Sequence, residues 1–296
     1  MRSNSSGSQD FEHIRHNLTS KVLATKQPVR NQSSLLRCAP LLVITLIFVG
    51  NLWQKTDPDL WGHIRFGQLM LSAGRIVSHD EYSYTALNHS WRDHEYLTEV
   101  VMAGIYDTTG VVGLKVWKLA CVAAMVLFLV QALAETGASS LVQLAALGFA
   151  ICASAQFTQF RPQLHTYMLF SLTLALLAKD SYRGSAPLWL MVPVMGLWSN
   201  LHGGFVIGLL TLTIYAGAVG GLALFDVNTI GHARKVGLTA MVATCTTLLP
   251  PNGLSTWRAV LTTVSNPMTF KIFTEWEPLS TAIGEQWRFN HYGIIA

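Results

Sequence analysis

The sequence predicts an all-α integral membrane protein, a polytopic helical bundle with about seven transmembrane helices. Of its 296 residues, 51% are hydrophobic and only 12% are charged, whereas a soluble domain carries roughly 25% charged residues. The charges are also unevenly spread, because they gather in residues 1–37, in the stretch 55–118 and in short clusters between long apolar runs. A soluble core does not need uncharged runs this long, but a helix that crosses a bilayer needs ~20 such residues.

The predicted spans follow these apolar runs in order, and only the span 112–134 contains charged residues, Lys115 and Lys118 near its first end. The run 184–225 contains no Asp, Glu, Lys or Arg and is about twice the length that one crossing requires. Its polar stretch 199–204 predicts the turn of a hairpin, so we expect two spans there. The full set of predicted spans is 38–54, 112–134, 136–160, 162–178, two within 184–225, and 236–249.

Lys and Arg residues near the span ends predict the orientation, because cytoplasmic loops are enriched in them. Their total is equal on the two sides, so the short loops decide: those on the side of the tail carry Lys and Arg, whereas the turn 199–204 has neither. We therefore expect the N-terminus in the cytoplasm. Loop 55–111, Arg161, the turn 199–204 and the segment after Pro250 then face one outer surface.

The chain is expected to have three parts. Residues 1–37 form a disordered basic cytoplasmic tail, 38–258 a transmembrane module with the extracytoplasmic loop 55–111, and 259–296 an extracytoplasmic or interfacial C-terminal segment. Basic residues in the tail are scattered singly among polar ones, which favours a solvated tail over a nucleic-acid-binding segment. The four cysteines lie in apolar runs without paired spacing, so neither a disulfide nor a metal site is predicted from them.

Loop 55–111 predicts two amphipathic helices that lie at the membrane surface, within a large first extracytoplasmic loop. Pro58 suits the first turn of a helix, and Asp57 just before it suits the N-cap. Asp59 and His63 are four residues apart and therefore share one face of this helix. That face would present a carboxylate and an imidazole, although capping and solvation explain the same residues without a function.

The second predicted surface helix begins near His94 and Glu95. Its expected apolar face consists of Leu97, Val100, Val101 and Gly104. Further polar residues near the outer span ends are functional candidates, because ionisable groups at membrane depth are costly. A snorkelling end residue, a plain turn and an aromatic belt are the simpler interpretations of these candidates: Arg161, His165, Asn200, His202 and Trp276.

The stretch from Asp59 to Gly74 resembles the GT-C superfamily of membrane glycosyltransferases, such as protein O-mannosyltransferases and lipid A aminoarabinose transferase. These proteins keep an acidic residue just after the first span, followed by an amphipathic helix that ends in a glycine turn. The chain looks closer still to a group of poorly characterised bacterial membrane proteins. The matching residues are Asp57, Asp59, Trp61, His63, Gly74, Asp80, Ser83, Tyr84, Thr85, Trp91, His94, Glu95, Leu97, Arg161, Pro162, Gln163, the stretch 198–204, Glu275 and Trp276.

Two departures from the family pattern stand beside the resemblance. Leu60 occupies the position where the family usually has a second acid directly after the key aspartate. The chain also stops soon after the last predicted span, where such proteins usually continue with more spans, so a truncated chain is one expectation.

The resemblance implies an inverting glycosyltransferase in a bacterial inner membrane that takes a sugar from a polyprenyl-phosphate carrier. Asp59, with Asp57 beside it, is then the candidate base for an extracytoplasmic acceptor hydroxyl. Arg161 suits the departing phosphate, because a guanidinium pairs bidentately with phosphate oxygens. The expected substrate-binding residues are His63, Glu95, Arg161, His165, Asn200, His202 and Trp276.

Other classes of function stay open. The acidic pair Asp57 and Asp59 resembles a site for Mg²⁺ or Mn²⁺. The proposed sugar transfer does not require such a metal. A transporter or an assembly subunit would be a polytopic membrane protein without catalysis, and an inactive remnant of the GT-C fold is a third alternative. The sequence leaves the sugar, the acceptor and the oligomeric state undefined.

Overall fold

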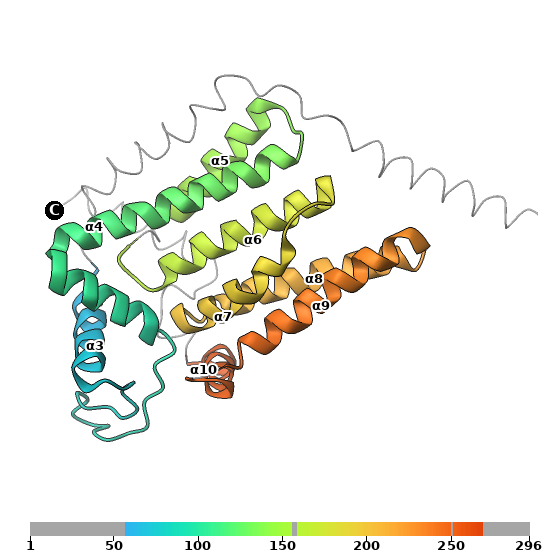
Figure 1. Ribbon diagram of the computed structural model, residues 1–296. Helices are drawn as coiled ribbons and strands as arrows, with labels where there is room; N and C mark the ends of the chain where they lie inside the picture. The colour runs from blue at the N-terminus through green and yellow to red at the C-terminus, as the bar shows by residue number, and fades with distance from the viewer. Residues whose placement is uncertain (1–56, 156–158, 250, 269–296) are drawn as a thin grey trace, which may run out of the picture.

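The computed structural model describes residues 57–155, 159–249 and 251–268, which form helices joined by turns, with a single isolated β-bridge between His79 and Ser90 (Figure 1). The predicted all-α class is therefore confirmed for this part of the chain. The helices are α3 (Leu60–Ala73), α4 (Tyr96–Glu135), α5 (Ser140–Ala155), α6 (Gln163–Arg183), α7 (Met191–Leu201), α8 (Phe205–Ala223), α9 (Ile230–Thr246) and α10 (Leu254–Ser265), with short 3-10 helices at Leu188–Leu190 and Val227–Thr229.

Two of these helices, α4 and α8, are long and apolar enough to cross a membrane by length and composition. In the most apolar stretch of each, 28% of the residues are buried inside the chain, so most of that surface faces outward. Every predicted span from 112 onward overlaps a helix, although α5 and α7 are shorter. The tail 1–37, the span 38–54 and the end of the C-terminal segment from 269 lie outside the described residues.

A kink at Gly110 divides α4 into two parts (Figure 1). Gly110 has φ 64° and ψ −156°, a conformation that residues with a side chain rarely adopt. The part before the kink packs on α3, and the part after it packs on α6 through Cys121, Val122 and Leu164. The kink coincides with the predicted boundary between the outer loop and the second span.

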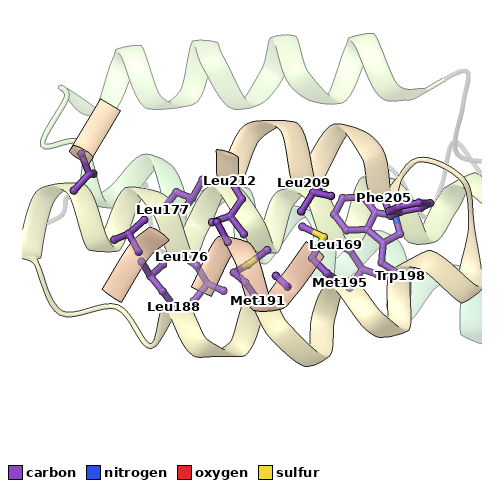
Figure 2. Packing of buried hydrophobic residues seen from close by; sticks show 14 of the residues in the cluster. Leu169, Leu176, Leu177, Leu188, Met191, Met195, Trp198, Phe205, Leu209 and Leu212 are labelled. Carbon is purple, nitrogen blue, oxygen red and sulfur yellow. The ribbon is translucent and has the colours of Figure 1, made fainter. Parts of the chain in front are cut away.

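The largest core lies among α6, α7, α8 and α9, as Figure 2 shows. Trp198, Phe205, Met191, Met195 and Leu212 are fully buried in it. The side chains come from four helices, so the core holds these helices together as a bundle.

The bundle has two ends (Figure 1). At one end lie α3, the first part of α4, the α7–α8 turn and α10, and at the other lie the α4–α5, α6–α7 and α8–α9 connections. At this second end Asp180 of α6 accepts a hydrogen bond from the Tyr215 hydroxyl of α8 (2.7 Å) and pairs with His232 of α9 (2.9 Å). Arg183 pairs with Glu135 there and ties α6 to α4. Polar contacts thus fasten the helices at the end remote from α3.

Close packing of α3 on α4 depends on Gly67. A Cβ atom built on Gly67 would lie 2.0 Å from the main-chain oxygen of Glu99 and 2.7 Å from the Cβ of Ala103. The backbone of α3 at Gly67 therefore lies directly against α4, and it can approach this closely because residue 67 has no side chain. The contact fixes where Asp59 and His63 lie relative to α4.

We expect Gly67→Ala to lower the stability of the protein by ~1–3 kcal/mol, because α3 must move away from a backbone atom that cannot yield. Gly62→Ala is the matched control, since a Cβ there meets nothing within 4 Å, and it should raise stability by ~0.5–1 kcal/mol through helix propensity. Thermal unfolding of both variants in detergent measures the difference. Equal effects of the two substitutions would contradict the close α3–α4 contact.

Candidate functional site

An ion pair joins the start of α3 to the start of α6. Nε of Arg161 lies 2.5 Å from Oδ2 of Asp57, and Nη2 of Arg161 lies 3.0 Å from Oδ2 of Asp59. The other carboxylate oxygen of Asp57 accepts the main-chain N–H of Asp59 at 2.9 Å. Two acids from a tight turn thus hold one guanidinium at the end of the bundle that carries α3.

The expected N-cap needs a correction. Asp57 was predicted as the N-cap of the first surface helix, but α3 begins at Leu60 and its N-cap residue is Asp59. Asp57 lies two residues before it, and Oδ1 of Asp57 accepts the main-chain N–H of Asp59. The side chain of Asp59 makes no capping hydrogen bond, so both carboxylates are available to Arg161.

The two acids differ in exposure, and this difference separates their roles. The side chain of Asp57 is 1% exposed and that of Asp59 is 61% exposed, while that of Arg161 is 25% exposed. A buried charge must be paired to stay buried, so Asp57 and Arg161 fix each other. The Asp59 carboxylate is accessible to a molecule arriving from outside.

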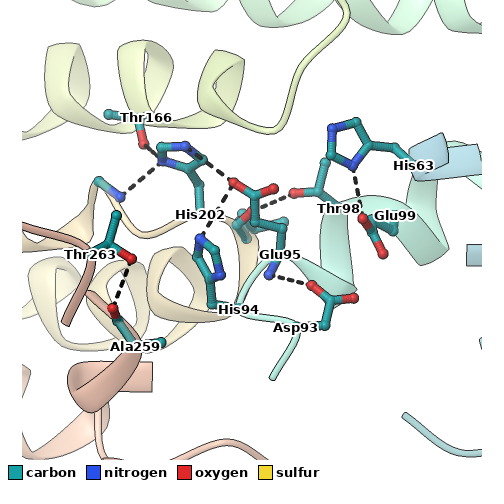
Figure 3. Close-up of polar contacts among 12 residues, drawn as sticks. His63, Asp93, His94, Glu95, Thr98, Glu99, Thr166, His202, Ala259 and Thr263 are labelled. Carbon is teal, nitrogen blue, oxygen red and sulfur yellow. Dashed lines mark hydrogen bonds and ion pairs between the residues drawn. The ribbon is translucent and has the colours of Figure 1, made fainter. Parts of the chain in front are cut away.

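His63 contacts the first part of α4 rather than the ion pair. Its Nδ1 lies 2.8 Å from Oε1 of Glu99, whose side chain is buried (Figure 3). Burial lowers the pKa of His63, and the carboxylate of Asp59 partly offsets this effect. Among the described residues, Oε2 of Glu99 is a buried oxygen without a hydrogen-bond partner.

His202 connects the α7–α8 turn to the start of α4. Its Nε2 lies 3.3 Å from Oε1 of Glu95, and its Nδ1 accepts the main-chain N–H of Gly204 at 2.9 Å (Figure 3). The hydroxyl of Thr166 lies 2.8 Å from the same Nδ1 and itself accepts a hydrogen bond from Nε1 of Trp198 at 3.0 Å. The ring is therefore fixed by contacts with α6, α7 and the turn.

Burial sets the protonation of this pair. It lowers the pKa of His202 to about 3, with the nearby His94 and His165 adding repulsion of the charged form. It raises the pKa of Glu95 to about 8, and the Asp93 carboxylate raises it further, while Arg161 lowers it. Near neutral pH both partners are thus largely uncharged.

Asp93 and its neighbours complete the start of α4. Oδ1 of Asp93 accepts the main-chain N–H of Glu95 at 2.8 Å, and the Asp93 carbonyl accepts Nδ2 of Asn252 at 2.6 Å. Nε2 of His94 lies 3.7 Å from Oε1 of Glu95. The turn before α10 is therefore tied to the acid that pairs with His202.

Two expected binding residues lie in the helix packing behind this surface. His165 is buried, with Nδ1 3.2 Å from the hydroxyl of Thr98 and its ring 5.1 Å from that of Trp117. Asn200 accepts a hydrogen bond from the Tyr96 hydroxyl at 3.0 Å. Both join the start of α4 to neighbouring helices. Trp276 lies outside the described residues.

The part of α4 before the kink buries a mixed polar and apolar face. Its most buried residues are Thr98, Glu99, Met102 and Ala103. The four residues predicted to share an apolar face are half-buried: Leu97, Val100, Val101 and Gly104. Two hydrogen bonds favour the inward position of Thr98 and Glu99: the Thr98 hydroxyl donates to the Leu201 carbonyl, and Oε1 of Glu99 contacts Nδ1 of His63.

Sequence reasoning missed Asp93, Thr98, Glu99 and Thr166 as members of the site. The spacing of Glu95 and Glu99, four residues apart on one helix, was the available signal for a shared acidic face. No group of three or more His, Cys, Asp or Glu among the described residues is arranged to hold a metal ion. Asp57 and Asp59, considered for Mg²⁺ or Mn²⁺, both contact a guanidinium instead.

Comparisons of the chain with protein-family profiles, with curated proteins and with solved structures find no match.

We expect Asp57→Asn to lower the stability of the protein by ~2–4 kcal/mol, because it removes one partner of a buried ion pair. Asp59→Asn should cost less than ~1 kcal/mol, since an exposed ion pair contributes little. Thermal unfolding in detergent compares the two variants, which make the same chemical change two residues apart. Equal losses would contradict the division into a buried and an accessible carboxylate.

Proposed function

We propose that this chain is a membrane glycosyltransferase that moves a sugar from a polyprenyl-phosphate-linked donor to an extracytoplasmic acceptor. The observation that carries the proposal is the contact between the exposed Asp59 carboxylate and Arg161. It pairs a candidate base with a candidate phosphate-binding cation at one end of an apolar helical bundle. The reaction needs a base beside the acceptor hydroxyl and a cation beside the departing phosphate, so both groups must lie near the same anomeric carbon.

A membrane location is supported by apolar side chains on the outside of the bundle. They are exposed along helices on several sides, and water would not favour that many of them. In a bilayer the same side chains would contact lipid tails. Examples are Leu127, Leu141, Phe149, Ile207, Leu210, Ile214, Leu222, Leu238 and Met241.

The proposed chemistry uses the difference between the two acids. The oxygen of an acceptor hydroxyl attacks the anomeric carbon, its proton passes to the Asp59 carboxylate, and the bond from carbon to phosphate oxygen breaks. The electron pair of that bond leaves with the lipid phosphate, which pairs with Arg161. Because Asp59 is exposed, the incoming phosphate can replace it at Nη2 of Arg161, while Asp57 keeps its hold on Nε.

The proposed topology has the site outside and the Arg183 end in the cytoplasm, with the N-terminus also cytoplasmic. In a variant whose four cysteines are replaced by serine, Ser90→Cys should react with an impermeant thiol reagent on intact cells. Ser181→Cys is the matched control, since Ser181 is also exposed and lies at the other end of the bundle, and it should react only after lysis. The reverse pattern would remove the basis for a site that meets a lipid phosphate on the outer surface.

Asp59→Asn should lower sugar transfer by ~10²–10⁴-fold, because asparagine keeps the size of the side chain but cannot accept a proton. Arg161→Lys should be intermediate, since the charge remains and the bidentate fork is lost. Transfer from a labelled polyprenyl-phosphate sugar in membranes measures both. Glu81→Gln, which changes an exposed acid in the same outer loop, is the control and should keep normal turnover.

The outcome against the proposal is equally definite. If the wild type transfers sugar and Asp59→Asn keeps near-normal turnover, Asp59 is not the base. If the correctly inserted wild type transfers no sugar from any polyprenyl-phosphate donor offered, the assignment as a glycosyltransferase is wrong.

A further inference from the structure

His63 is held by one of its two ring nitrogens. Nδ1 of His63 lies 2.8 Å from Oε1 of Glu99, and the ring makes no other hydrogen bond within the part of the chain that the structure describes (Figure 3). A contact of this length between an imidazole nitrogen and a carboxyl oxygen requires one hydrogen between them. The contact therefore fixes the rotation of the ring and leaves Nε2 as the nitrogen for a ligand.

The partner of His63 is itself firmly placed. The main-chain oxygen of Glu99 lies against α3, where a Cβ atom on Gly67 would be only 2.0 Å from it. Gly67 and His63 are four residues apart on α3 and therefore share one face of the helix. The side chain of Glu99 is 5% exposed. The backbone and the side chain of Glu99 thus both contact one face of α3, and the carboxyl group does not need to move when a ligand binds.

Nε2 of His63 is accessible from outside, although most of the ring is packed. The side chain of His63 is 17% exposed. Among the described residues, the buried side-chain nitrogen and oxygen atoms without a hydrogen-bond partner belong to Glu99 and Gln143. Nε2 of His63 has no partner there either, but it is not one of these buried atoms. The exposed part of the ring therefore includes Nε2.

His63 lies next to the Asp59 carboxylate. Its main-chain N–H donates to the Asp59 carbonyl at 3.0 Å, as expected for one turn of a helix. Residues four apart on a helix share a face, with about 5–6 Å between their Cβ atoms. Oδ2 of Asp59 in turn lies 3.0 Å from Nη2 of Arg161. A ligand whose phosphate binds Arg161 and whose next group passes Asp59 therefore has one helical turn to cover before it meets His63.

A hydroxyl group suits Nε2 in either protonation state of the pair. If the shared hydrogen belongs to Nδ1, then Nε2 of a neutral ring accepts a hydrogen bond. If it belongs to Glu99, then Nε2 carries the ring hydrogen and donates. A hydroxyl both donates and accepts, whereas an unprotonated phosphate oxygen only accepts. Sugars carry several hydroxyl groups close to the carbon that bears the phosphate.

We propose that Nε2 of His63 forms a hydrogen bond with a hydroxyl group of the sugar on the lipid phosphate, and that Glu99 is the positioning residue that orients the ring. This inference rests on the proposed function, because it names the residue that recognises the sugar of the same donor. Arg161 binds the phosphate, Asp59 lies beside the carbon that reacts, and His63 contacts the sugar. No covalent bond is made or broken at His63.

Binding measurements test the inference without turnover. The full-length protein in phosphatidylcholine nanodiscs is titrated with farnesyl phosphate and with its glucose, mannose and N-acetylglucosamine conjugates. His63→Asn should weaken the binding of at least one conjugate by ~2–10-fold, which is the range for the loss of one hydrogen bond, and should leave the binding of farnesyl phosphate unchanged. Asparagine keeps a polar group near the position of Nδ1, so the contact with Glu99 can persist while Nε2 is lost.

Matched variants separate recognition from a structural role. Ser72→Ala changes an exposed residue of the same helix and should leave the affinities for farnesyl phosphate and its conjugates unchanged. Glu99→Ala should weaken the same conjugate as His63→Asn, because the ring is no longer oriented. Glu99→Gln should restore that affinity, because an amide can donate to Nδ1 or accept from it. A merely structural role of either residue would lower the affinity for farnesyl phosphate as well.

The opposite results are equally definite. The inference is wrong if His63→Asn changes the affinities for farnesyl phosphate and for all its conjugates by the same factor, or changes none of them. An unchanged conjugate affinity in Glu99→Ala would overturn the positioning role of Glu99. A wild type that binds a conjugate through His63 but transfers no sugar would overturn the proposed function alone. Normal transfer by His63→Asn with unchanged conjugate affinity would overturn the inference and leave the proposed function in place.

Discussion

The ion pair of Asp57 with Arg161 is the contact on which the arrangement of the outer end depends. It joins the turn before α3 to a residue two positions before α6, and the two are far apart in the sequence. Because Asp57 is buried, the pair cannot open without leaving an uncompensated charge. Together with the close contact of α3 and α4 at Gly67, this ion pair holds α3, and with it Asp59 and His63, at the outer end.

A second set of contacts organises the rest of that end around uncharged polar groups. His202, Glu95, Thr166 and Trp198 form hydrogen bonds among α4, α6, α7 and the α7–α8 turn. The ion pair and this second set lie at the same end of the bundle (Figure 1). Anionic ligands are recognised through both kinds of contact.

Much of the helical arrangement was predictable, whereas the pairing of side chains was not. Long apolar runs located the helices between residues 112 and 249, because such runs are visible in composition, and Pro58 and Gly74 marked the limits of α3. The inward face of Thr98 and Glu99 could not be predicted, since it depends on partners from α3 and α7 that are remote in sequence. Likewise, Asp57 and Asp59 look alike in the sequence, and their different exposure arises from the bend between them.

The kink at Gly110 gives the first part of α4 the geometry of a lever. Glu95 lies fifteen residues before the pivot, a distance of roughly 22 Å along the helix axis at 1.5 Å per residue. A change of only about 5° in the bend would displace the far end by about 2 Å, which is enough to break a hydrogen bond. A small change in the backbone angle at Gly110 therefore has a large effect at the start of α4, although the two are far apart. The contacts of Asp93 with Asn252 and of Glu95 with His202 hold the start of α4 in place.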